Sequence, residues 1–188
     1  DFDGCGHEGP SYLSYGIGAG VEFAECLRQM GRGDLFTETN WHIIAPWIVS
    51  EMLPHRGLWN NLSDCGHGRL PGNAVYSYAC GRLAELARKE PFMEGERLAP
   101  TDDLTHGLDY IQHFQEAPGE RKLSYGAMAA LMGWAWNHTD WENSVKELQP
   151  ASALAYTLFH EDCTALHDPG KILPEGLLFR GRGLVSLR

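Results

Sequence analysis

The first twenty residues contain several side chains that can bind or transfer protons. The stretch DGCGHEGPSYLSYGIGAG (residues 3–20) places His7, Glu8, Tyr12 and Tyr15 within nine residues, among glycines and one proline. Glycine loses more backbone freedom on ordering than other residues, so an ordered glycine-rich loop usually has unusual dihedral angles or lies against a ligand. The stretch therefore predicts either a loop at an active site or a turn with packed aromatic rings.

A second group of polar side chains lies in a long segment that has no helical periodicity. Residues 54–73 carry groups that can bind anions or sugars, namely His55, Arg56, Asn60, Asn61, Asp64, His67 and Arg69. Loops longer than about 12–15 residues are uncommon in compact domains and are often functional. Stacked helical hairpins would place this loop and the opening stretch at related ends of successive helices, which predicts that His7 and Tyr15 lie near Arg69.

Two kinds of chemistry are open alternatives for these residues. A metal site could be assembled from His7, His55 and His67, although their spacing matches no metal motif and the sequence has no H-E-x-x-H. A glycoside hydrolase could use Glu8 and Asp64 as its pair of carboxyl groups. A binding domain without catalysis, with Trp59 as a surface for a sugar ring, is a further alternative from a different class.

The combination of tyrosine, histidine and arginine fits a third chemistry, β-elimination on polysaccharides that contain uronic acids. The sugar carboxylate must be neutralised before its α-proton can be removed, and the two-pronged guanidinium of Arg69 matches two carboxylate oxygens. A tyrosine or histidine can then take the proton, and a tyrosine can return one to the leaving oxygen. An acidic substrate would need only a local basic site, which the histidines and arginines of residues 54–73 supply.

Composition limits the other classes. A chain of 188 residues is long enough for one domain with a core, and its net charge of −10 argues against binding to nucleic acid. No apolar run approaches the roughly 20 residues that a membrane span needs, so no membrane partner is expected. The five cysteines form no C-x-x-C pair, and they are interpreted as small buried side chains.

The apolar spacing predicts a mainly α fold. Helices are expected over residues 17–30, 41–52 and 74–89, and weaker patterns cover 104–115, 125–136 and 151–159. The closing GLLFRGRGLVSLR alternates apolar and polar residues and predicts a strand or a hairpin. Because the chain starts with Asp and such strands cannot bury their own face, we expect a piece of a longer protein that ends where a β domain begins.

Three segments resemble a known family. DGCGHEGPSYLSYG, LWNNLSDCGHGR and LLFRGRGLVSLR are similar to motifs of heparinase II/III-like polysaccharide lyases, which are related to hyaluronate and chondroitin lyases. The resemblance implies an incomplete (α/α) toroid of helical hairpins over residues 1–172. It implies that residues 173–188 begin a β-sandwich, against which the toroid would pack. We expect no cofactor in the helical part, whereas the β domain of the family sometimes holds a structural metal.

The resemblance also implies roles for individual residues. His7 would neutralise the carboxylate or act as base, Tyr15 would be base or acid, Arg69 would hold the substrate, and Glu8 would orient His7. The expected substrate-binding residues are Tyr12, Arg56, Trp59, Asn60 and His67. The substrate would be an acidic polysaccharide such as a glycosaminoglycan or alginate, and we expect a secreted or periplasmic location. Some members place the catalytic tyrosine further downstream, where Tyr76 or Tyr78 would be the substitute.

Overall fold

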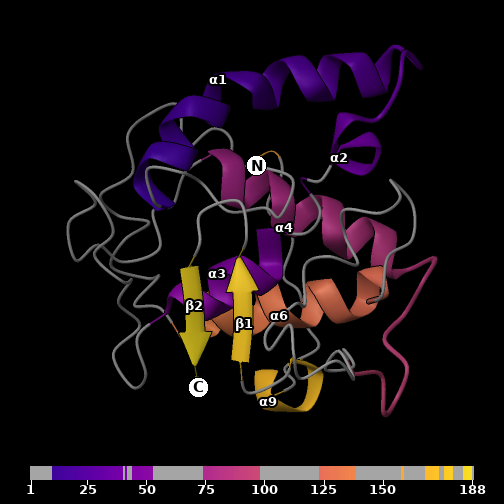
Figure 1. Cartoon of the computed structure of the whole chain (residues 1–188). Coiled ribbons are helices and arrows are strands. Elements are labelled where there is room, and N and C mark those ends of the chain that lie inside the picture. Colours follow the sequence, from indigo (N-terminus) through magenta and orange to yellow (C-terminus); the bar gives the residue numbers. More distant parts are fainter. Residues whose placement is uncertain are drawn as a thin grey trace.

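The computed structural model describes residues 10–39, 41, 44–52, 74–97, 123–138, 158, 168–173, 176–179 and 184–187. In chain order its elements are α1 (Pro10–Gln29), α2 (Leu35–Glu38), α3 (Ile44–Glu51), α4 (Ala74–Ala87), α6 (Tyr125–Asn137), α9 (Pro169–Ile172), β1 (Gly176–Phe179) and β2 (Leu184–Leu187). Figure 1 shows their arrangement. The described part of the chain is mainly helical, as the sequence predicts.

The first helix begins earlier than its apolar spacing predicts. α1 starts at Pro10 and not at Ile17, so the second half of the glycine-rich opening stretch is helical and the prediction of a loop there is wrong. Proline is favoured in the first helical turn because its missing N–H would be unpaired there and its φ is already helical. Tyr12 and Tyr15 consequently belong to the first turns of a helix.

The helix α1 ends just before the segment Gly31-Arg32-Gly33, close to the end of the predicted helix of residues 17–30. Gly31 has a φ of 64°, which is in the left-handed region that glycine adopts without strain. Its amide donates to the carbonyl of Arg28 (3.0 Å), and the amide of Arg32 donates to the carbonyl of Leu27 (2.9 Å). These two bonds form a Schellman motif, which satisfies carbonyls at the end of the helix.

Close packing does not require a glycine at two positions inside α1. A Cβ atom added at Gly18 or at Gly20 would meet nothing within 4 Å. We therefore expect Gly18→Ala to raise the free energy of unfolding by about 0.5–1 kcal/mol, because alanine has a higher helix propensity than glycine. Urea denaturation followed by circular dichroism would measure this, and a destabilised variant would contradict the open surroundings of Gly18.

Between α1 and α3 the structure has a short helix that apolar spacing does not indicate. The carboxylate of Asp34 begins α2 by accepting a hydrogen bond from the amide of Phe36 (3.2 Å). Aspartate is among the best residues at this position. Helix α3 then starts at Ile44, and Pro46 lies within its first turn, where proline is tolerated.

The core of the described helices is centred on α6, which packs against both α3 and α4. Ten of its residues are buried, namely Gly126, Ala127, Met128, Ala129, Ala130, Leu131, Met132, Gly133, Ala135 and Trp136. A helix that is buried on all sides lies inside its domain. None of the described helices is long and apolar enough to cross a membrane.

The turn after α4 fixes where α6 begins. The carbonyl of Glu90 accepts a hydrogen bond from the amide of Gly126 (2.9 Å), so α6 starts beside the end of α4 and runs back along it (Figure 1). Ser124 caps α6 by accepting from the amide of Ala127 (3.0 Å). The carboxylate of Glu96 in turn accepts from the hydroxyl of Ser124 (2.7 Å) and from its amide. These bonds hold the start of α6 beside the end of α4, and the two helices run antiparallel.

The described chain ends in a β-hairpin. β1 and β2 pair antiparallel, with Gly176 opposite Leu187 and Phe179 opposite Leu184. The hairpin follows α9, whose first turn is capped by the carboxylate of Asp168. A two-stranded sheet is marginally stable alone, and β2 contacts α3. The toroid and the following β-sandwich stay predictions.

Candidate functional site

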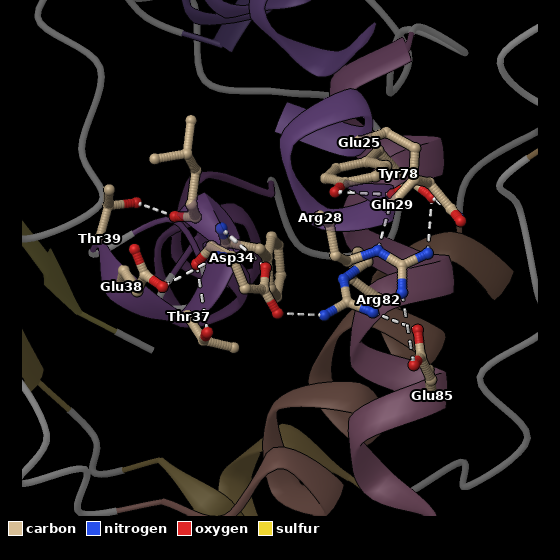
Figure 2. Close-up of polar contacts among 12 residues, drawn as sticks. Glu25, Arg28, Gln29, Asp34, Thr37, Glu38, Thr39, Tyr78, Arg82 and Glu85 are labelled. Carbon is tan, nitrogen blue, oxygen red and sulfur yellow. Dashed lines mark hydrogen bonds and ion pairs between the residues drawn. The ribbon is translucent and has the colours of Figure 1, made fainter. Parts of the chain in front are cut away.

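A group of interacting polar and charged side chains joins α1, α2 and α4. We call it the interhelix polar cluster, and it consists of Glu25, Arg28, Asp34, Tyr78, Arg82 and Glu85 (Figure 2). Three elements that are separate in the sequence contribute to it. Its bonds therefore fix how α1 and α2 lie against α4.

Glu25 receives hydrogen bonds from its own helix and from α4. The guanidinium of Arg28 donates to both carboxylate oxygens (2.9 and 2.6 Å), and the amide nitrogen of Gln29 donates to one of them (2.6 Å). The hydroxyl of Tyr78 donates to the other oxygen (3.2 Å). Arg28 also lies 3.8 Å from the carboxylate of Glu85 on α4. The second half of α1 is thus tied to α4 at two points.

Arg82 makes the corresponding connection between α4 and α2. Its side chain is buried, and it pairs with the carboxylates of Asp34 and Glu85. Its Nε atom has no hydrogen-bond partner among the residues described. Removing one member of such a buried pair is strongly destabilising because the other charge is left uncompensated. Asp34 uses one oxygen for Arg82 and the other for the first turn of α2.

Neighbouring groups shift the pKa values of Glu25, Arg28 and Tyr78 in directions that suit a structural role. Hydrogen bonding to Arg28 lowers the pKa of Glu25, although partial burial opposes this. The pKa of Arg28 is raised by the same bond. Burial, and then the negative charge of Glu25, raises the pKa of Tyr78. The tyrosine is therefore a neutral hydrogen-bond donor near neutral pH, and it is a poor proton acceptor.

The lowered pKa of Glu25 predicts a pH-dependent contribution to stability. Because the folded pKa lies below the ordinary value of 4.5, the contribution is present above that pH and is lost as the pH falls through the folded pKa. We expect Glu25→Gln to lower the free energy of unfolding by about 1–2 kcal/mol at pH 7. The difference from the unchanged protein should shrink below about pH 4.5 in denaturation curves. A difference that stays constant down to pH 3 would contradict the role of the charge.

The cluster is not suited to acid–base catalysis. Its charges are paired, and Tyr78, with 1% of its surface exposed, already donates its hydroxyl proton to Glu25. Tyr76 is also fully buried. This arrangement disfavours both tyrosines as the downstream substitute for Tyr15. Sequence reasoning missed the cluster because only the Glu25–Arg28 and Arg82–Glu85 spacings, three residues along a helix, are visible locally.

Most of the catalytic and binding residues that the sequence predicts lie outside the described residues. These are His7, Glu8, Arg56, Trp59, Asn60, His67 and Arg69, together with the hydrolase candidate Asp64 and the metal candidate His55. Tyr12 and Tyr15 lie in α1, where the path of the helix is described. Their predicted juxtaposition with Arg69 therefore stays a prediction.

The two tryptophans of α6 differ in how far they are buried. Trp136 is buried. Trp134 is half-buried and stacks on the ring of His138 with 4.2 Å between the ring centroids. Trp47 is fully buried in α3. Within the described ranges, no group of three or more His, Cys, Asp or Glu side chains could hold a metal ion.

The family resemblance rests on the sequence motifs alone. The motifs in residues 3–16, 58–69 and 177–188 carry it, and the mainly helical fold is compatible with it. No protein-family model, curated protein or solved structure matches this chain at a significant level.

Proposed function

We propose that this chain is the helical part of a polysaccharide lyase that cleaves uronate-containing glycans by β-elimination. The observation that carries the proposal is the order of His7, Tyr15 and Arg69 within two segments that resemble lyase motifs. The described fold supports it in one respect. Packed helices are followed by a β-hairpin at residues 176–187, which is the order of elements expected for such an enzyme.

In the proposed reaction the substrate carboxylate is bound first. Arg69 neutralises its charge, assisted by His7 where His7 is not the base, so that the proton on the adjacent ring carbon becomes acidic. Tyr15 or His7 removes that proton, the electron pair forms a carbon–carbon double bond, and the bond to the leaving glycosidic oxygen breaks. A tyrosine returns a proton to this oxygen. Glu8 orients His7, and the sugar chain is bound by Tyr12, Arg56, Trp59, Asn60 and His67.

The helix α1 supplies the connection between this chemistry and the described structure. Its first turns contain Tyr12 and Tyr15, directly after His7 and Glu8 in the sequence, and its second half is bonded to α4 through Glu25. In the proposed enzyme the interhelix polar cluster therefore holds the helix on which the reactive tyrosine is carried. We assign it this positioning role and no contact with substrate.

An absorbance assay tests the proposal. The natural full-length protein would be incubated with heparan sulfate, hyaluronan, chondroitin sulfate and alginate, and near-ultraviolet absorbance and new reducing ends would be recorded in parallel. An increase in both supports elimination, because only that reaction forms an unsaturated product. New reducing ends without absorbance would replace the proposal by a hydrolase that uses Glu8 and Asp64. Glycan binding with neither signal would replace it by a binding domain.

A further inference from the structure

Helix α1 contains the sequence Gly-Ile-Gly-Ala-Gly at residues 16–20, between its first turns and its second half. The part after this segment is anchored in the molecule. Val21 and Ala24 are buried. The carboxylate of Glu25 accepts a hydrogen bond from the hydroxyl of Tyr78, and Arg28 lies beside Glu85. Residues 21–29 are therefore held to α4 by apolar packing and by charged hydrogen bonds.

The segment of residues 16–20 has the lowest helix propensity in α1. Glycine is a poorer helix former than any residue except proline, and three of these five residues are glycine. Close packing does not explain why positions 18 and 20 are glycine, since an added Cβ atom would meet nothing within 4 Å at either position. Figure 1 shows that the first turns of α1 run at an angle to the rest of the helix. Sharp bends in helices arise at residues of this kind.

We propose that residues 16–20 form a hinge, about which the first turns of α1 move relative to its anchored second half. The moving part carries Tyr12 and Tyr15. Glycines absorb the change in backbone dihedral angles, whereas the interhelix polar cluster keeps residues 21–29 in place. The existence of the hinge does not depend on the reaction. Its effect on turnover rests on the proposed lyase function, in which the tyrosine would approach the bound sugar and withdraw to release the product.

Amide hydrogen exchange of the full-length protein tests the hinge directly. We expect the amides of residues 14–20 to exchange at least tenfold faster than those of residues 21–29, because local opening needs no disruption of the anchored part. The double variant Gly18→Ala/Gly20→Ala should slow the faster group about tenfold. The control is Phe23→Ala, in which an exposed side chain of the anchored part is removed from the same helix. Equal exchange in both parts, or equal slowing by both variants, would overturn the hinge.

Turnover is measured on the same variants. We expect the double variant to reduce kcat about fivefold with little change in KM, although it is more stable, while Phe23→Ala keeps the original kcat. Unchanged turnover together with slowed exchange would overturn the link between hinge and catalysis. If no glycan gives an unsaturated product with the unchanged protein, the lyase proposal fails, and the exchange result alone decides the hinge.

Discussion

Replacing Gly126 by alanine is expected to lower the free energy of unfolding by about 3 kcal/mol or more, which is at the upper end of what overpacking costs. A Cβ atom at this position would lie 1.9 Å from the backbone nitrogen of Phe92 and 2.4 Å from the carbonyl carbon of Pro91. Backbone atoms cannot rotate away as a side chain can. The turn after α4 would have to move, and the bond between the amide of Gly126 and the carbonyl of Glu90 would break.

Thermal unfolding followed by circular dichroism measures the effect, and a loss of this size corresponds to a Tm lower by about 10 °C. Gly18→Ala is the matched control, since it makes the same chemical change in a helix but should be stabilising. If Gly126→Ala does not fold, Ser124→Ala tests the same end of α6 more mildly, with an expected loss of about 1 kcal/mol from the missing cap. Equal stability of Gly126→Ala and the unchanged protein would contradict the close approach of α6 to residues 91–92.

The second large effect concerns activity. In the proposed lyase, Tyr15→Phe should reduce kcat by roughly 10²–10⁴, the usual contribution of a group that transfers a proton in the transition state. Only one hydroxyl is removed, and the phenylalanine keeps the ring, so the fold should be unchanged. The rate of formation of the unsaturated product in the near ultraviolet is the measurement, with circular dichroism as the check on folding.

The control for Tyr15→Phe is Tyr110→Phe, which removes the same hydroxyl at a position to which we assign no role. It should retain the original kcat. Full activity of Tyr15→Phe would reject Tyr15 as the reactive residue. The role would then pass to Tyr12, because Tyr76 and Tyr78 are buried.

Local signals in the sequence were sufficient for α4 and α6. The apolar spacing of α4 and the alanine-, leucine- and methionine-rich sequence of α6 place both helices within one or two residues of their observed ends. Gly31 gives the end of α1 because a left-handed residue is needed there. The start of α1 was missed because helix propensity weighs against a glycine-rich stretch, whereas Pro10 at the first position favours it.

Contacts between distant segments could not be predicted in the same way. Nothing in the neighbouring residues indicates that Arg82 pairs with Asp34, or that Gly126 must leave space for the backbone of Phe92. Such requirements arise only when helices have packed. For the candidate lyase residues, short motifs indicate the chemistry. Their spatial arrangement depends on the packing of residues 54–73, which local sequence does not predict.

The ion pair between Asp34 and Arg82 also has a consequence for how the chain is made. Its two residues are 48 positions apart, so the ribosome has to add all of α4 up to Arg82 before α2 can find its partner. At the usual rate of about 5–20 residues per second, this takes roughly 2–10 seconds. During that time Val21, Ala24 and Phe36 have no α4 to cover them. The nascent chain therefore carries an apolar surface that can be covered only after α4 has been made.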